Sequence, residues 1–313
     1  MKIRFISTAL VVLISFSIQA QTTQAYNEME TKWTSAINLY KKGMYVPAQK
    51  LFSEILLHDG QEYASYKDEA AFYYALSSMN LLNNDAEFQI TNFIENHPES
   101  RNSNNASFQM ANFKFRNKDY KNAIKWYEKT DRLLLQADEK SEYFFKLGYS
   151  HFARKDFDRA AKAFYESKDA NNIYGPMSLY FYSHLKYINE QYQTALLGFL
   201  ELEKSPSYAS ITPFYIIHIY YLQEKYDELI EYAPKILEKE SGGRAAEINK
   251  LLGSAYYRKG RYSEAIPHLN NYVNSTSSAN DYDYYELGFA YYNTKQYDKA
   301  ANSFSKIANM KDT

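Results

Sequence analysis

A short phrase, an aromatic residue followed three positions later by alanine, recurs along this chain at a nearly fixed period. Its six full copies are Tyr45/Ala48, Tyr120/Ala123, Phe157/Ala160, Tyr192/Ala195, Tyr262/Ala265 and Tyr297/Ala300. Two weaker copies, Asn83/Ala86 and Tyr226/Leu229, each keep one of the two residues. Successive members of the alanine column, Leu229 included, lie 38, 37, 37, 35, 34, 36 and 35 residues apart. A period in this range predicts a stack of repeated units, each packed mainly against its neighbours.

Composition supports a layered core and argues against a polyanionic partner. Hydrophobic residues make up 45% of the 313 residues, and 33 residues are tyrosine. The formal net charge is −1, from 36 basic and 37 acidic residues, with no basic stripe or acidic tail. This balance disfavours nucleic acid or an anionic membrane surface as the main partner.

The amino terminus has the pattern of a secretory signal peptide. Lys2 and Arg4 precede an apolar run of 14 residues, 5–18, and Gln19-Ala20-Gln21 offers a cleavage point after Ala20. The run is short for a membrane span. We therefore expect a signal peptide at 1–20, a linker at 21–28, and no integral membrane span after cleavage. An uncleaved anchor is the alternative. The absence of cysteine removes disulfides and lipidated thiols and favours the periplasm of a Gram-negative bacterium.

The spacing inside one copy, residues 141–172, predicts a pair of antiparallel helices. Ala160 and Phe164 are four residues apart and share one helix face. Gly148, on the preceding helix, is small enough to let the two helices approach closely, and Phe157 would wedge the turn between them. These requirements are steric, which explains why these positions recur while the surface varies.

Two later phrases make the family resemblance plain. They are Leu252-Gly253-Ser254-Ala255-Tyr256-Tyr257 with Tyr262 to Ala265, and Leu287-Gly288-Phe289-Ala290-Tyr291-Tyr292 with Tyr297 to Ala300. Together with the closing His97-Pro98, they resemble a tetratricopeptide repeat (TPR) array. The resemblance implies an all-α, right-handed superhelical solenoid of about eight helix-turn-helix pairs over residues 29–313. The expected pairs start near residues 29, 67, 104, 141, 176, 210, 246 and 281.

Three departures from the pattern carry expectations of their own. Repeat two has Asn83-Asn84-Asp85 in place of the turn aromatic, which indicates a turn one residue shorter. Repeat six has Pro234 well inside its second helix, followed by Ser241-Gly242-Gly243. Residues 226–245 are therefore either a kink or hinge or simply an irregular repeat. The last helix carries Phe304 and Ile307 without a polar cap after it.

The uncapped end has two interpretations. The first is that the array continues beyond the carboxyl terminus, as in the amino-terminal part of the long exported TPR proteins that the chain resembles. The second is that the end docks onto a partner or a symmetry mate.

Motifs for catalysis, cofactors or metals are missing from the sequence. With ten glycines there is no glycine-rich phosphate-binding motif, the six histidines are scattered, and no nucleophile–base arrangement stands out. Acidic residues such as Asp156, Asp158, Glu264 and Asp298 fit helix starts, where they favour the helix dipole. We expect a non-enzymatic protein with no cofactor and no metal.

The resemblance implies that the first helix of each pair lines a concave face. Two columns on these helices, five and twelve residues before the turn aromatic, should lie on that face, with His184 and His218 between them. The first column is Tyr40, Phe115, Phe152, Tyr187, Tyr221, Tyr257 and Tyr292. The second column is Trp33, Phe108, Phe145, Tyr180, Phe214, Lys250 and Tyr285.

These rings could grip an extended peptide or a partner helix, or they could pack against the next repeat. The lysine-and-asparagine clamp of chaperone-binding TPR domains is not recognisable. Phe108 occupies the position where a basic side chain would be needed beside Asn112. We expect an exported scaffold that binds protein partners, possible clients being outer-membrane or envelope proteins, and not nucleic acid. The alternatives are a glycan-binding module and a structural spacer within a longer protein.

Overall fold

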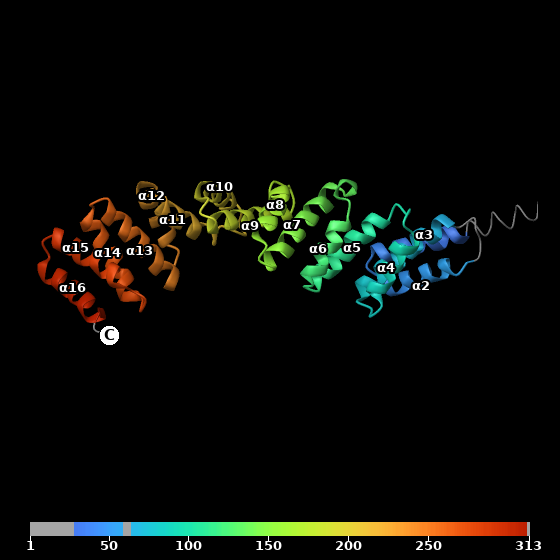
Figure 1. The fold of residues 1–313 in the computed structure, drawn as a ribbon, viewed down its shortest axis with the longest axis horizontal. Coiled ribbons are helices and arrows are strands. Elements are labelled where there is room, and N and C mark those ends of the chain that lie inside the picture. Colours follow the sequence, from blue (N-terminus) through green and yellow to red (C-terminus); the bar gives the residue numbers. More distant parts are fainter. Residues whose placement is uncertain (1–27, 59–63, 312–313) are drawn as a thin grey trace, which may run out of the picture. The chain divides into compact units, whose positions relative to one another are not determined.

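The computed structural model describes residues 28–58 and 64–311, and in those ranges the chain forms helices and no strand (Figure 1). The predicted signal peptide, 1–20, and the linker residues 21–27 lie outside the described residues. Described residues 28–41 form the first helix. The all-α fold built from helix-turn-helix pairs is confirmed.

The remaining helices follow at short intervals. They are α2 (Tyr45–Leu56), α3 (Ala64–Leu81), α4 (Ala86–Asn96), α5 (Ser103–Arg116), α6 (Tyr120–Lys129), the 3-10 turn η2 (Arg132–Leu134), α7 (Ala137–Ala153), α8 (Phe157–Ser167), α9 (Tyr174–Ile188), α10 (Tyr192–Leu202), α11 (Thr212–Leu222), α12 (Tyr226–Leu237), α13 (Gly242–Arg258), α14 (Tyr262–Ser275), α15 (Asp281–Asn293) and α16 (Tyr297–Lys311). Each pair consists of an odd-numbered helix and the even-numbered helix after it.

The chain divides into two compact units, Met1–Ala163 and Phe164–Thr313, with the boundary inside α8. Within each unit, helices contact their neighbours in sequence. Odd-numbered helices also contact the next odd-numbered helix: α3 with α5 and α5 with α7 in the first unit, α11 with α13 and α13 with α15 in the second. The first helices of the pairs therefore line one common face in each unit, which we call the inner face.

Each turn between the helices of a pair has the same left-handed residue. Seven turns place it five residues before the alanine column, at Gly43, Lys118, Lys155, Glu190, Glu224, Gly260 and Lys295. Repeat two places it at Leu82, four residues before Ala86, so the predicted shorter turn is confirmed. In each turn two backbone N–H groups reach back to the helix end, as Lys155 N does to Phe152 O and Asp156 N to His151 O. This hydrogen-bond pattern ends the helix and reverses the chain.

The alanine column is buried in every pair. Seven of its eight members are 0% exposed and Ala300 is 2% exposed. Across the pair, a methyl carbon placed at Gly253 would lie 2.8 Å from the side chain of Leu269. At Gly288 it would lie 2.7 Å from the ring of Phe304. Small residues here are required by the distance between the two helices.

Repeat six is continuous at its proline. Helix α12 runs through Pro234 to Leu237. The glycine pair, expected as a flexible connection, instead forms the first turn of α13, with Gly242 at a φ of +59°. Proline near a helix end removes one hydrogen bond, and the surrounding packing tolerates that loss.

Candidate docking surfaces

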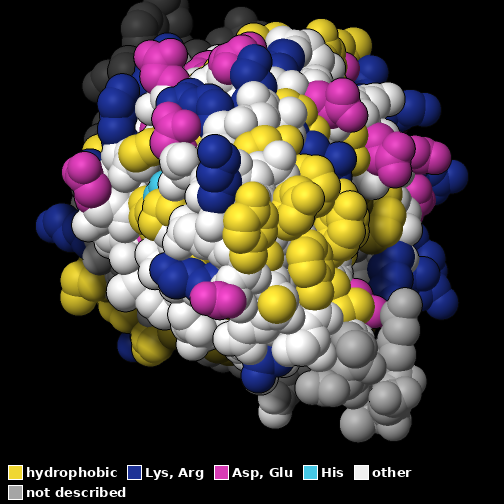
Figure 2. Space-filling view, turned by 90° about the vertical axis from the view of Figure 1, so that its left-hand side faces the viewer, with side chains coloured by type: hydrophobic (Ala, Val, Ile, Leu, Met, Phe, Trp, Pro, Cys, Tyr) yellow, Lys and Arg dark blue, Asp and Glu magenta, His cyan; other side chains and the backbone are white. Residues whose placement is uncertain are grey.

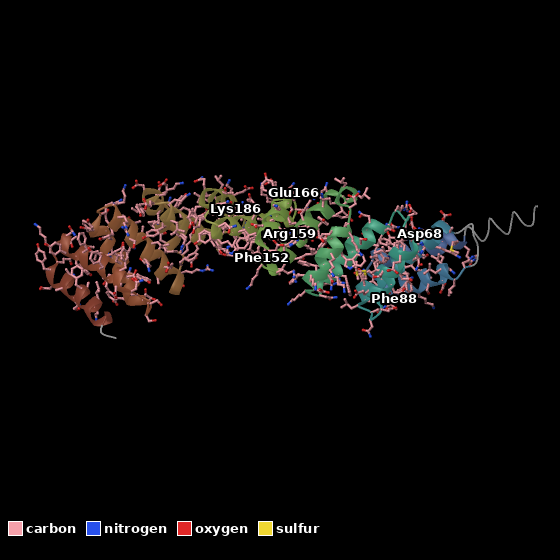
Figure 3. All side chains as sticks on the ribbon, viewed as in Figure 1. Asp68, Phe88, Phe152, Arg159, Glu166 and Lys186 are labelled. Atoms are coloured by element: carbon pink, nitrogen blue, oxygen red, sulfur yellow. The ribbon has the colours of Figure 1, made fainter. Side chains whose placement is uncertain are left out.

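The first aromatic column joins the two helices of each pair. Every ring in it contacts the turn aromatic of its own repeat, with ring centroids 5.3 to 6.1 Å apart. Phe152, at the end of α7, makes this contact with Phe157 at 5.6 Å (Figure 3). Such contacts stabilise the helix pair beyond the area they bury. The first role of this column is therefore structural.

Rings of the same column also contact the first helix of the next repeat. Tyr40 lies 5.0 Å from Tyr73, and Phe115 lies 5.7 Å from Tyr149. In the second unit, equivalent contacts join Tyr187 to Tyr215 at 5.4 Å and Tyr257 to Phe289 at 5.8 Å. These rings fill the junctions between repeats, as the packing alternative in the sequence suggested. Much of their surface is therefore closed to a ligand.

The second column is packed more deeply. Phe108 and Phe145 are 1% and 5% exposed, so these two predicted binding residues lie in the core and do not face solvent. Trp33 is half-buried against Phe52, 5.8 Å away. Tyr180 stacks on Tyr208 at 5.5 Å. Apolar rings at these positions gain more from the neighbouring repeat than from water, which the spacing alone did not reveal.

Three predicted positions of the second unit, Phe214, His184 and His218, pack against neighbouring side chains. Phe214 contacts His218 at 4.4 Å, and the imidazole of His218 faces the carboxylate of Glu247 at 3.9 Å. His184 packs against Tyr180 and Tyr215. Burial lowers the pKa of both histidines, which favours neutral imidazoles.

Charged and polar groups lie beside the rings at the junction of α13 and α15. Lys250 pairs with the buried carboxylate of Asp283 at 3.1 Å. Tyr221 has its pKa raised by burial, and Ser254 is its hydrogen-bond partner. Ser254 also donates a hydrogen bond to Glu286, which is 1% exposed. Polar contacts thus occupy part of a junction in which Tyr257 also contacts Phe289.

In the two predicted columns, only the last member of each is exposed to solvent. Tyr285 is 44% exposed and Tyr292 is 57% exposed, both on α15. Figure 2 shows hydrophobic side chains gathered at the end of the second unit where α15 and α16 lie.

A polar pocket of about 380 Å³ opens on the inner face of the first unit. Its lining comes from the first helix, α3, α5 and α7, the leading helices of four consecutive repeats. The apolar side consists of Tyr40, Leu76, Met79, Phe113 and Phe115. The polar side consists of Asn80, Gln109, Asn112, Arg116, Glu142 and Lys146. We call this site the amide pocket.

Hydrogen bonds orient the polar side of the amide pocket. The amide oxygen of Asn112 accepts from the hydroxyl of Tyr127 at 2.8 Å and from the ammonium of Lys146 at 3.2 Å. With both lone pairs used, Asn112 can offer a ligand only N–H donors. Lys146 also pairs with Glu142. The guanidinium of Arg116 donates to the carbonyl of Met79 at 3.1 Å.

Tyr40 and Asn80 close the other end of the pocket. The amide nitrogen of Asn80 donates to the hydroxyl of Tyr40 at 3.4 Å. Burial raises the pKa of Tyr40 to about 12, which keeps the hydroxyl protonated. The pocket thus combines amides, two cations and one carboxylate over an apolar floor.

Sequence reasoning singled out Tyr40, Phe115 and Asn112 but missed most of the polar side. The sequence does contain a pattern that indicates two of the missed residues. Gln109 and Lys146 stand 14 residues before their repeat's alanine, where Phe181 and Tyr215 stand in later repeats. Gln109 and Lys146 are consecutive polar members of a column that also holds Phe72, Phe181 and Tyr215. Among the residues that the structure describes, no cluster of three metal-ligating side chains occurs.

Comparison with known proteins identifies the repeats. A tetratricopeptide repeat family matches residues 223–283, and a second tetratricopeptide repeat family matches residues 284–309. The earlier repeats share the turn geometry and buried alanine column of this matched region. The chain is a tetratricopeptide repeat protein. No curated protein sequence matches it.

Several solved structures are similar over part of the chain. MamA 41-end from Desulfovibrio magneticus RS-1 is 17% identical, covers 55% of this chain and 94% of its own, and has a TM-score of 0.46. YrrB, described as a TPR protein with an unusual peptide-binding site, is 16% identical, covers 60% and 93%, and has a TM-score of 0.48. MamA AMB-1 is 15% identical, covers 56% and 93%, and has a TM-score of 0.48.

In residues 28–58 and 64–311, no helix is both long enough and apolar enough to cross a bilayer.

Proposed function

We propose that this protein is a non-catalytic scaffold that binds an extended segment of a partner protein in the amide pocket. The tetratricopeptide repeat fold supports a protein–protein interaction scaffold in general. The observation that carries the specific proposal is the set of amide and charged side chains on three consecutive leading helices, α3, α5 and α7, above an apolar floor. Fold alone would not locate a site.

The chemistry of the pocket suits a peptide main chain. An extended peptide presents alternating N–H and C=O groups, and side-chain amides can form hydrogen bonds with both. Asn112 supplies donors to carbonyl groups, and Lys146 and Arg116 add cationic donors. Leu76 and Met79 provide an apolar floor for a side chain of the ligand.

The same geometry disfavours the sugar-binding alternative. Stacking on a sugar needs a flat and open ring face. Phe115 is held between the edges of Tyr120 and Tyr149, at 5.8 and 5.7 Å, and the guanidinium of Arg116 lies 5.6 Å from the ring centre of Phe113. Neither phenylalanine is free to stack on a pyranose.

Export remains part of the proposal. It rests on Lys2, Arg4, the apolar run and the cleavage point after Ala20, all outside the described residues. Under this proposal the partners belong to the periplasm or the outer membrane.

A photo-crosslinking residue at Asn80, placed in the intact gene and irradiated in living cells, tests the proposal. We expect one dominant protein adduct, formed by a chain whose amino terminus begins at Gln21. Adding Arg116→Ala should reduce the adduct at least about fivefold, because one cationic donor is lost from the pocket.

The matched control carries the crosslinker at Phe88 on α4, which is 65% exposed and lies outside the pocket (Figure 3). Equal labelling at Asn80 and Phe88 would contradict the pocket as the site. A glycan adduct at Asn80 would replace the peptide proposal with the sugar alternative. An uncleaved amino terminus would contradict export alone.

A further inference from the structure

A second pocket, of about 360 Å³, opens in the second unit between helices α14, α15 and α16. Its polar lining comes mainly from α14 and α16 and consists of Asn270, Asn274, Lys299, Asn302, Ser303 and Lys306. The rest of its lining consists of Val273, Tyr284, Leu287 and Tyr291. No carboxylate is among these described lining residues, whereas in the amide pocket Lys146 pairs with Glu142. We call this site the lysine pocket.

Helical spacing brings the donors of the lysine pocket to one opening. Lys299, Asn302 and Lys306 are three and four residues apart, so they share one face of α16. Asn270 and Asn274 are four residues apart and share a face of α14 in the same way. Two helices therefore present two ammonium groups and three side-chain amides to the same space.

The two lysines keep their charge available to a ligand. Both Lys299 and Lys306 are exposed, and in the part of the chain that the structure describes neither forms an ion pair. The ammonium of Lys299 donates to the amide oxygen of Gln296 at 2.9 Å and lies 5.5 Å from the ring centre of Tyr291. Both contacts are with uncharged groups, so the positive charge at the pocket is not compensated.

This donor set is particular to one junction and is not a requirement of the repeat. Counted from the alanine column, Glu238 takes the place of Asn274 at the preceding junction, between α12 and α14. Glu264 takes the place of Lys299 there. Asparagine is also one of the poorer helix formers, so helix stability does not explain it at three lining positions. The set therefore points to a ligand.

We propose that the lysine pocket binds a phosphate monoester. Near pH 7 such a group carries a charge of about −1.5 to −2 and three strong acceptor oxygens. The two ammonium groups match this charge, and the asparagine amides supply further N–H donors to the oxygens. A carboxylate, with a single charge and two oxygens, would leave positive charge and donors unmatched.

The size of the lysine pocket leaves room for the organic part of the ligand. Its volume of about 360 Å³ lies within the range of small-molecule sites, about 300–1,000 Å³. Val273 and Tyr284 offer apolar surface next to the donors. The ligand is therefore an esterified phosphate with an organic group attached, and not the free ion alone.

Phenyl phosphate is the probe, and phenyl sulfate is its matched analogue with the same ring but a single negative charge. Each is titrated into the full chain at constant ionic strength and followed by calorimetry. We expect saturable binding of phenyl phosphate, about fivefold or more tighter than that of phenyl sulfate, because the second charge meets a second ammonium group. Lys299→Gln and Lys306→Gln should each weaken it about threefold or more, and the double variant about tenfold or more.

The matched control replaces Lys239 and Lys295 by glutamine. Both side chains are exposed and lie outside the pocket, and their loss changes the net charge as much as the double pocket variant does. The control should bind phenyl phosphate like the unaltered chain. Far-ultraviolet circular dichroism checks that every variant is folded, as expected when only exposed lysines are changed.

Vesicles distinguish a soluble source of the phosphoryl group from a lipid headgroup. The full chain is sedimented with phosphatidylcholine vesicles that contain or lack phosphatidic acid, whose headgroup is a phosphate monoester. We expect no added sedimentation, because a chain of net charge −1 has no overall attraction to an anionic bilayer. Sedimentation that requires phosphatidic acid and is lost in the double pocket variant would identify the lipid as the source of the same group.

Equal affinity for phenyl phosphate and phenyl sulfate would overturn the proposal, as would the absence of saturable binding. Equal weakening in the control variant would also overturn it, because overall charge and not the pocket would then attract the anion. The lysine pocket lies in the second unit and the amide pocket in the first, so the failure of either proposal leaves the other intact.

Discussion

At the scale of single residues, the turns show how weakly one position depends on residue type. Only two of the eight left-handed turn positions are glycine, Gly43 and Gly260. The others include Lys155 at a φ of +63° and Glu224 at +56°. A residue with a Cβ pays about 1–2 kcal/mol in this conformation. The packing of rings and alanines on both sides supplies enough energy to hold it.

Gly260 offers a clean measurement of that cost. No atom lies within 4 Å of the position where its Cβ would be, so Gly260→Ala adds backbone strain without a clash. We expect a loss of about 1 kcal/mol in the free energy of unfolding, and a gain of similar size for Lys155→Gly. Urea unfolding measures both. A stabilising Gly260→Ala would contradict the left-handed geometry.

At the scale of helix pairs, small residues decide how close two helices lie. Gly253 faces Leu269 so tightly that an added methyl carbon would lie 2.9 Å from its backbone nitrogen as well as 2.8 Å from its side chain. A backbone atom cannot move aside as a flexible side chain can. The α13–α14 contact therefore tolerates little added volume.

Gly253→Ala should consequently destabilise the protein, although alanine favours helix formation. Overpacking costs about 1–3 kcal/mol, against a gain of about 1 kcal/mol in helix propensity. Gly243→Ala, in the same helix but with no atom within 4 Å of its added carbon, is the matched control and should be neutral or slightly stabilising. Thermal unfolding of the two variants should separate them by several degrees.

At the scale of the whole molecule, buried titratable groups make stability depend on pH. His151, His184, His218 and His268 occupy both units, and burial lowers the pKa of each. As the pH falls, the four imidazoles take up protons near pH 6.5 in the unfolded chain and only at lower pH in the folded chain. Stability is therefore lost as the pH falls below about 6.5. Burial raises the pKa of the Glu286 carboxyl, so this single group acts in the opposite direction.

The midpoint temperature of thermal unfolding should accordingly decrease when the pH is lowered from 7.5 to 5.5. A variant with His184→Gln and His218→Gln should show a smaller fall, because two of the four groups no longer take up protons on unfolding. An unchanged fall in that variant would show that other groups control the pH dependence.

The sequence by itself determined the repeat, the helix pairs, the tight alanine column and even the shortened turn before Ala86. These follow from steric requirements that are local to one pair and recur at a fixed period, so they can be read from spacing alone. The family of repeats could be predicted for the same reason.

Only the tertiary structure decided which recurring rings are buried and which are open. Phe108 and Tyr285 occupy equivalent positions, yet one is 1% exposed and the other 44%. The amide pocket likewise needs α3, α5 and α7 to come together, which spacing within one repeat does not describe. The physical reason is that burial at a junction depends on the neighbouring repeat. The spacing within one repeat carries no information on whether that neighbour is apolar, polar or missing from the described chain.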